Sequence, residues 1–267
     1  MQFSALDPIP ATMLLEEGDL DVTTGKSRLV GDPYRGQDPR LLAAYTTSEA
    51  ARYLRIPERT LFDWAFGYAY RVKRERRQMS AVIRVANEER HLLSFTNLAE
   101  LHVLDALRRV HQVRMKKIRQ TVLYLTQEFK TDHPLVHQDM WTDGASVFID
   151  HYGDLVNASH EGQLAMRQIV EAHLRRIERD VTGIVRLFPF TRKRPAAEHV
   201  ADEPRIIAID PRVAFGRPVI TGSRIPTAEI AERFKAGESL KDLSADFRRS
   251  IEEIEEAVRV ELELEAA

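Results

Sequence analysis

Residues 45–67, YTTSEAARYLRIPERTLFDWAFG, carry the signals of two short helices joined by a tight turn. Thr46 stands three residues before Glu49, which is the spacing of a capping box at a helix start. Pro57 cannot continue that first helix but suits the first turn of a second one, and Gly67 can end the second. The pattern predicts a helix-turn-helix, a unit that DNA-binding proteins use and that also occurs in proteins that never touch DNA.

Apolar residues at helical spacing would give this unit a small core. The residues expected in that core are Ala50, Leu54, Ile56, Leu61 and Trp64. Polar and basic residues around the turn are candidates for DNA contact. These candidates are Arg52, Arg55, Arg59 and Thr60.

A basic run, RVKRERR, follows at residues 71–77 with five positive charges. Contacts of Lys and Arg with phosphates supply most non-specific DNA affinity, so we expect Arg71, Lys73 and Arg74 to contact DNA. Residues 81–95 then read as two strands around a polar turn, which predicts a wing there.

Charge is distributed unevenly along the chain although the net charge is only -2. Residues 45–130 hold 17 Lys and Arg against 9 Asp and Glu, whereas residues 226–267 hold 6 against 12. This asymmetry favours a nucleic-acid-binding part followed by a part that does not bind nucleic acid. Solvated helix faces would give the same counts.

Two longer helices are predicted beyond the basic run, the first capped by Thr96 and the second within residues 113–130. Their apolar stripes are expected in the core or in a homodimer interface over residues 98–129. The stripes consist of Leu98, Leu101, Leu104, Leu107, Val110, Ile118, Val122, Leu125 and Phe129.

Residues 1–44 hold few large apolar residues, and we expect them to be disordered or loosely packed. The tetrapeptide TGKS at residues 24–27 resembles the end of a phosphate-binding loop, but Leu20 stands where that loop requires glycine. The chain has no cysteine, no apolar run long enough to span a membrane and no signal-peptide pattern at its start. A cytoplasmic protein without disulfides is therefore expected.

Residues 131–194 are expected to form a small α+β unit, with short strands in 133–159, a helix in 162–180 and a strand in 183–190. A charged linker is expected at 195–205. Four residues were considered as metal ligands, but their spacing matches no ligand pattern, so no metal or cofactor is predicted. They are His133, His137, Asp139 and His151.

Residues 206–267 predict a short β-hairpin followed by three helices. Ser239 and Ser250 are the expected caps of the second and third helices. The expected core residues are Ile230, Phe234, Leu240, Leu243, Phe247, Ile251, Ile254 and Val258. Val260 and Leu264 fall on the other side of the last helix, either by chance or as a partner-binding ridge.

Residues 209–243 resemble the bacterial antitoxin-like domain of unknown function 433. The matching positions are Asp210, Pro211, Gly216, Pro218, Gly222, Arg224, Ile225, Pro226, Gly237 and Ser239. With the N-terminal half, the chain looks like VapB-type antitoxins that join a MerR-like helix-turn-helix to this module. The resemblance implies a mainly α, α+β fold, neutralisation of a PIN-domain ribonuclease toxin encoded by the adjacent gene, and repression of the shared operon.

The resemblance also implies residues for toxin binding. An arginine inserted among the carboxylates of a metal-dependent nuclease can neutralise them, and Arg217 or Arg224 would serve, unless each holds its own turn instead. The full set of expected toxin contacts is Phe215, Arg217, Arg224, Ile225, Val260 and Leu264.

One position departs from the MerR-like pattern, because Phe62 stands where an arginine is usual. Arg59 or the basic run at residues 71–77 would have to supply the DNA contact that this arginine usually makes. A transcription regulator with a ligand-sensing middle or C-terminal part is the alternative function, and no catalytic motif supports an enzyme. Operator DNA and a second copy of the chain are the remaining expected partners.

Overall fold

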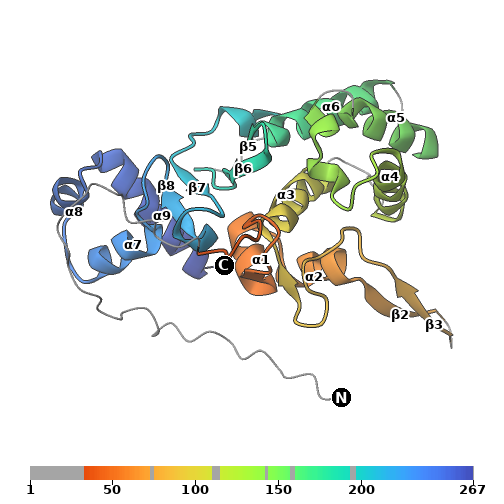
Figure 1. Ribbon diagram of the computed structural model, residues 1–267. Helices are drawn as coiled ribbons and strands as arrows, with labels where there is room; N and C mark the ends of the chain where they lie inside the picture. The colour runs from red at the N-terminus through yellow and green to blue at the C-terminus, as the bar shows by residue number, and fades with distance from the viewer. Residues whose placement is uncertain are drawn as a thin grey trace, which may run out of the picture. The chain divides into compact units, whose positions relative to one another are not determined.

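The expected helix-turn-helix consists of α1 (Thr47–Leu54) and α2 (Glu58–Phe66) in a computed structural model (Figure 1). The structure describes residues 33–72, 75–109, 115–141, 144–156, 160–192 and 197–266. Thr46 caps α1 in a complete capping box with Glu49, and Gly67 ends α2. All five expected core residues are buried, so the sequence interpretation of this unit is confirmed.

The wing is a hairpin of β2 (Tyr68–Val72) and β3 (Glu75–Met79), directly after α2. Our expectation of a wing at residues 81–95 is wrong. That segment is an irregular connection with buried Val82, Ile83 and Val85. It ends in β4 (Leu92–Leu93), which pairs with β1 (Tyr45–Thr46). Its apolar residues therefore belong to the core rather than to a projecting hairpin.

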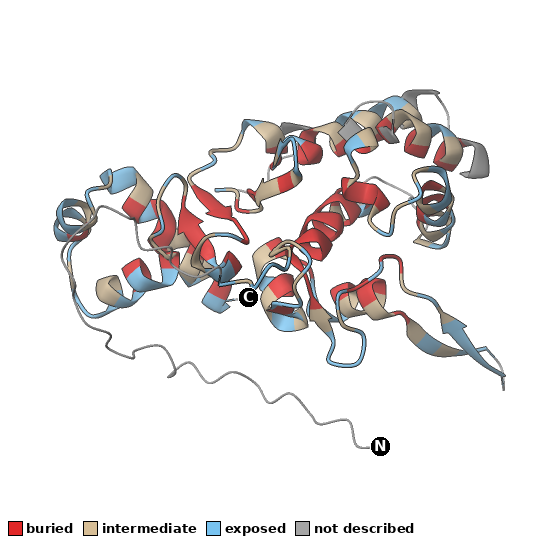
Figure 2. Ribbon diagram, in the orientation of Figure 1, coloured by how far each residue is buried: buried red, intermediate tan, exposed pale blue. Residues whose placement is uncertain are grey.

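Helix α3 (Phe95–Arg109) runs through the core, and α4 (Met115–Glu128) follows it (Figure 2). The cap of α3 is Ser94 and not Thr96, since the Ser94 hydroxyl accepts the Asn97 N–H at 3.1 Å. The four leucines expected in a dimer interface on α3 are at most 1% exposed. They pack inside the chain, so the expected interface is wrong for α3.

The described elements between residues 134 and 174 are all helices, which corrects the expectation of short strands in 133–159. They are η1 (Pro134–Val136), η2 (Gln138–Trp141), α5 (Gly144–Val156) and α6 (His160–Leu174). The buried residues of α5 repeat at helical spacing. These residues are Ala145, Phe148, Ile149 and Tyr152.

One antiparallel sheet joins β5 (Ile177–Asp180), β6 (Gly183–Leu187), β7 (Ile207–Ile209) and β8 (Pro218–Ile220) in that order. Leu187 of β6 pairs with Ile209 of β7, so these neighbouring strands precede and follow the segment expected as a linker. That segment contains η3 (Ala197–Asp202). The buried Arg176 guanidinium donates to backbone carbonyls before this segment and inside it. These carbonyls belong to Phe188, Phe190 and Pro204.

The C-terminal helices are α7 (Thr227–Lys235), α8 (Leu240–Phe247) and α9 (Ile251–Ala266). Ser239 and Ser250 accept the expected N–H groups at the starts of α8 and α9. Val260 is fully buried and Leu264 is 5% exposed, whereas Ile251, expected in the core, is 47% exposed. A partner-binding ridge of Val260 and Leu264 is therefore wrong, because both pack inside the protein.

Residues Gly36–Ala267 make up one unit of the chain and Met1–Arg35 another. Residues 1–32, including TGKS, lie outside the described part of the chain. Residues 36–44 of the expected loose extension are anchored, since Arg40 pairs with Asp38 at 2.6 Å and donates to the Thr182 carbonyl. None of the described helices has the length and apolar character needed to cross a membrane.

Candidate DNA-binding surface and C-terminal motif

The turn between α1 and α2 uses Arg55 as a structural residue. Its φ is 53°, and its N–H reaches the Ala51 and Arg52 carbonyls, which ends α1. The Arg55 side chain pairs with Glu263 of α9 and donates to the Thr191 carbonyl. These contacts occupy the Arg55 guanidinium within the chain, which disfavours the expected DNA contact.

The remaining helix-turn-helix candidates lie at the surface. Arg52 is exposed and Thr60 is half-buried. The Arg59 side chain is 75% exposed and pairs with Asp63 one turn later, at 3.0 Å. This pairing reduces the positive charge that α2 presents to DNA.

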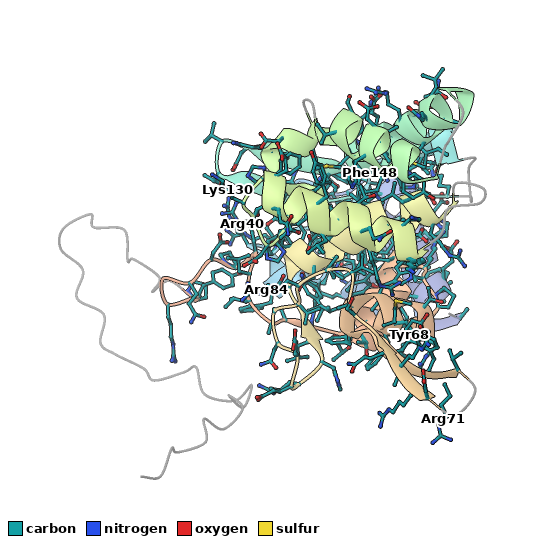
Figure 3. The ribbon with its side chains drawn as sticks, turned by 90° about the vertical axis from the view of Figure 1, so that its right-hand side faces the viewer. Arg40, Tyr68, Arg71, Arg84, Lys130 and Phe148 are labelled. Atoms are coloured by element: carbon teal, nitrogen blue, oxygen red, sulfur yellow. The ribbon has the colours of Figure 1, made fainter. Side chains whose placement is uncertain are left out.

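The β2–β3 wing carries exposed arginines on paired strands. Arg71 lies opposite Arg76, and Tyr70 lies opposite Arg77. Figure 3 shows the Arg71 side chain directed away from the helices at the outer part of the hairpin. Lys73, between the strands, lies outside the described residues together with Arg74.

Arg76, Arg77 and the wing tyrosines are surface residues that the sequence interpretation missed. The alternation in YAYRV and ERRQM is the signal that would have located the hairpin. The register leaves only Lys73 and Arg74 between Val72 and Glu75. This loop lacks the Asn-Gly or Gly signal by which two-residue hairpins are recognised.

The wing is anchored to the body at its base. Gly67 has a φ of 76°, and a Cβ there would stand 2.4 Å from the Met79 carbonyl oxygen at the end of β3. From α4, the Arg119 guanidinium donates to the Ser80 carbonyl at 2.8 Å, and burial lowers the pKa of Arg119. The orientation of the wing therefore depends on both α2 and α4.

The C-terminal motif begins with an unusual left-handed turn, η4 (Ala214–Gly216). Its three residues have φ values of 47°, 53° and 77°. The Tyr45 hydroxyl, from the helix-turn-helix, donates to the Gly216 carbonyl at 3.1 Å. A Cβ on Gly216 would stand 1.9 Å from that hydroxyl oxygen, so this close approach requires glycine.

Side chains of this motif are presented at the surface. Phe215 is 73% exposed, Arg217 and Arg224 are exposed, and Ile225 is half-buried. Neither Arg217 nor Arg224 forms an ion pair with a described residue. Since Val260 and Leu264 are buried, these four residues are the part of the expected toxin-binding set that lies at the surface.

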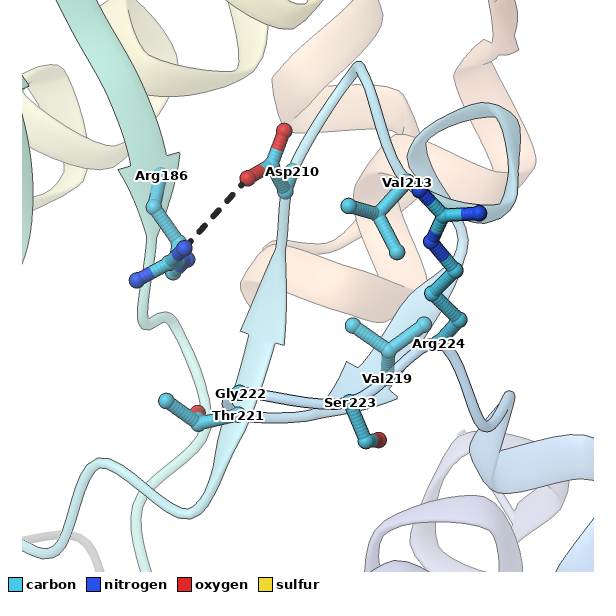
Figure 4. Close-up of a pocket in the computed structure, with 8 residues that line it drawn as sticks. All are labelled: Arg186, Asp210, Val213, Val219, Thr221, Gly222, Ser223 and Arg224. Carbon is cyan, nitrogen blue, oxygen red and sulfur yellow. Dashed lines mark ion pairs between the residues drawn. The ribbon is translucent and has the colours of Figure 1, made fainter. Parts of the chain in front are cut away.

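Arg224 lines a cavity of about 270 Å³ beside the turn that follows β8 (Figure 4). Val213 and Val219 form its apolar wall, and Arg186 and Asp210 form an ion pair at 3.5 Å in its lining. The cavity thus combines an apolar wall with charges of both signs, as small-molecule sites do.

The histidines considered for a metal are engaged in other contacts. His151 stacks on Tyr124 with ring centroids 4.0 Å apart, and His137 lies 3.1 Å from Asp139. His133 Nδ1 lies 2.9 Å from a carboxylate oxygen of the fully buried Glu100. Within the described ranges, no group of three metal-ligating side chains is found.

Burial acts on the His133–Glu100 pair in opposite ways for its two members. Burial raises the pKa of Glu100, against the opposing effect of the hydrogen bond to His133. Burial lowers the pKa of His133, but the hydrogen bond to Glu100 and its charge outweigh burial, so the pKa of His133 is raised overall. The pair links α3 to the residue that precedes η1.

Two family models match separate parts of the chain. Residues 43–122 match a family described as "Putative DNA-binding HTH domain", and residues 207–259 match "Protein of unknown function (DUF433)". The first match covers α1, α2, the wing, α3 and part of α4. The second covers β7 through most of α9.

One curated relative and one solved structure resemble nearly the whole chain. "Putative antitoxin VapB45" from Mycobacterium tuberculosis is 29% identical over 233 residues, which are 80% of this chain and 92% of that protein. The crystal structure of Rv2018 from the same organism has a TM-score of 0.58 and 23% identity, over 81% of this chain and 97% of that one. At this identity the likeness shows the α+β fold with an N-terminal helix-turn-helix. The resemblance to VapB-type antitoxins that join a helix-turn-helix to a DUF433 module is thereby confirmed.

Proposed function

We propose that this protein is the antitoxin of a type II toxin–antitoxin pair that also represses its own operon. One observation carries the proposal: the chain matches both the helix-turn-helix family and the DUF433 family. It is also similar to VapB45 over 80% of its own length. The wing and helix-turn-helix would bind operator DNA, and the C-terminal motif would bind the toxin. Dimerisation would match a two-fold operator.

The DNA-binding half of the proposal is supported by where the exposed cations lie. Arg71 and Arg76 are neighbours across the wing, and Arg52 is exposed on α1. Arginines on a projecting hairpin can contact phosphates while α2 lies in the major groove. The acidic α9 has the opposite charge character, which disfavours DNA contact there.

The toxin-binding half is supported by the left-handed turn and its surroundings. Phe215 and Arg217 project from a backbone that Tyr45 holds in one conformation, and Arg224 stands at a cavity rim. A PIN-domain ribonuclease would bring clustered carboxylates, which pair well with an arginine. Rigid presentation lowers the entropy cost of such binding.

The test is co-expression of the full chain with the neighbouring reading frame, scored for growth and co-purification. We expect the neighbour to be toxic alone and harmless in complex. Arg217→Glu and Arg224→Glu should each weaken rescue. Lys241→Glu, an exposed charge change on α8, should leave it intact.

Other outcomes separate this proposal from its alternative. A harmless neighbour that does not co-purify would refute the antitoxin function. A small molecule that binds at the 270 Å³ cavity and alters DNA affinity would then favour a ligand-sensing regulator.

A further inference from the structure

Helix α2 presents an aromatic face where a recognition helix ordinarily offers polar side chains. Leu61, Trp64 and Ala65 are buried against the core. Phe62 and Phe66 are only half-buried and lie on the other side of the helix. In a helix-turn-helix that side of the second helix is the one that enters the major groove.

The two phenylalanines form a three-ring cluster with His91, which comes from the connection before β4. The ring centroids of Phe62 and Phe66 are 5.0 Å apart. His91 contacts both rings edge-on, at 5.1 Å from Phe62 and 4.9 Å from Phe66. Phe66 also packs against the core, so the cluster that holds the Phe62 ring is anchored through Phe66.

The charged groups of α2 are largely satisfied within the protein. Arg59, the one cation in the sequence of α2, pairs with Asp63 at 3.0 Å. Glu58 accepts a hydrogen bond from the Thr47 hydroxyl at 3.3 Å. Guanine is usually read by an arginine that donates to its O6 and N7 atoms, whereas the 5-methyl group of thymine is read by apolar side chains. Phe62 suits the second type of contact.

We propose that Phe62 makes α2 selective for thymine by packing on its 5-methyl group, while the arginines of the wing hold the phosphates. The inference rests on the proposed DNA-binding function and adds the residue and the base that give it specificity. The aromatic cluster orients Phe62, and the Arg59–Asp63 pair leaves the apolar contact as the main source of discrimination on this helix.

The experiment selects a preferred duplex from a random pool with the full-length protein, then replaces each thymine in turn by 2′-deoxyuridine. Uracil pairs like thymine and lacks only the methyl group. We expect one or two positions per half-site at which Kd rises about fourfold, the value of one buried methyl group. At those positions Phe62→Ala should bind thymine and uracil equally.

Two further variants test whether the effect of Phe62→Ala comes from the lost apolar contact rather than from a change in the fold. Phe62→Leu keeps an apolar side chain and should retain part of the uracil sensitivity. Leu123→Ala, which alters an exposed leucine on α4, should retain all of it. Thermal unfolding monitors the fold of each variant.

Several results would overturn the inference. One is a wild-type protein that tolerates uracil at every position, and another is a Phe62→Ala variant with unchanged sensitivity. If Phe62→Ala leaves DNA binding intact and abolishes capture of the co-expressed neighbour, the cluster is a protein-docking surface instead. Selection of no duplex at all would refute the DNA-binding function itself, and with it this inference.

Discussion

At the scale of single residues, Tyr45 and Gly216 tie the helix-turn-helix to the C-terminal motif through one hydrogen bond. Gly216→Ala should lower the free energy of unfolding by roughly 2–4 kcal/mol, because the new Cβ would clash with the Tyr45 hydroxyl and occupy a left-handed conformation. Chemical denaturation measures the loss. Tyr45→Phe alone should cost about 1 kcal/mol and should partly rescue Gly216→Ala.

Gly222→Ala is the matched control for that experiment. Gly222 also has a positive φ, 72°, but a Cβ there would meet nothing within 4 Å. Only backbone strain remains, so we expect a loss of about 1 kcal/mol. Equal losses at the two glycines would contradict the close contact with Tyr45.

The pair of His133 and Glu100 makes stability depend on pH. The pKa of His133 is raised in the folded protein above its ordinary value of 6.5. Its contribution to the free energy of unfolding is therefore complete below pH 6.5 and is lost as pH rises through the pKa of the folded state. The raised pKa of Glu100 acts in the same direction. The free energy of unfolding should therefore fall as pH rises above 6.5.

Denaturation of variants at pH 6 and pH 8 tests the assignment of this dependence. His133→Phe should flatten the curve between pH 6 and pH 8. His151→Phe, at a histidine that stacks on Tyr124, should leave it in place. A pH dependence that survives His133→Phe would belong to Glu100 or to other groups.

Residue roles on α1 and α9 show where sequence patterns reach their limit. The capping boxes at Thr46 and Ser250 could be predicted because both partners lie within one turn of the chain. The ion pair of Arg55 could not be predicted because its partner, Glu263, is 208 residues away. Val260 and Leu264 were misassigned because α9 is buried on more than one side, which a single-stripe pattern does not anticipate.

At the scale of elements, the β2–β3 wing is expected to supply much of the electrostatic DNA affinity. Arg71→Ala and Arg76→Ala should each reduce the slope of log affinity against log salt concentration by about 1, if each contacts one phosphate. Titration of one operator duplex at several salt concentrations gives these slopes. The loss should be uniform across DNA sequences, since phosphate contacts carry no base information.

Arg84→Ala provides the control within the segment where the sequence had suggested a wing. The Arg84 guanidinium pairs with Asp132 at 2.6 Å, so its removal should leave the slope unchanged. A larger effect at Arg84 than at Arg76 would shift the DNA-binding surface to the connection between β3 and β4.

Helices and strands differed in how well the sequence predicted them. The C-terminal helices were predicted well, since caps and apolar periodicity agree there. Residues 144–156 were misread as strand because a DG turn signal was weighted above the helical repeat of Phe148, Ile149 and Tyr152. The hairpin at 68–79 was missed because its charged loop carries no turn signal.

At the scale of the whole molecule, sequence composition suggested separate modules, whereas the described contacts connect them. The β6–β7 pairing joins strands on both sides of the expected linker, and Arg176 binds one carbonyl before the linker and one inside it. Tyr45 and Arg55 contact the C-terminal part from the helix-turn-helix. Contacts of this kind arise between residues far apart in sequence, and no local pattern predicts them.

These contacts predict that residues 36–267 unfold cooperatively. Trp64 lies in the helix-turn-helix, and the sequence has only one other tryptophan, Trp141. In a Trp141→Phe background, fluorescence therefore reports on Trp64 while far-UV circular dichroism reports on all helices. We expect the two denaturation curves to coincide, and Gly216→Ala to shift both to the same extent although Gly216 lies in the other half of the sequence. If the fluorescence transition stays fixed while the dichroism curve splits, the helix-turn-helix is an independent module, and the Tyr45–Gly216 contact contributes nothing to its stability.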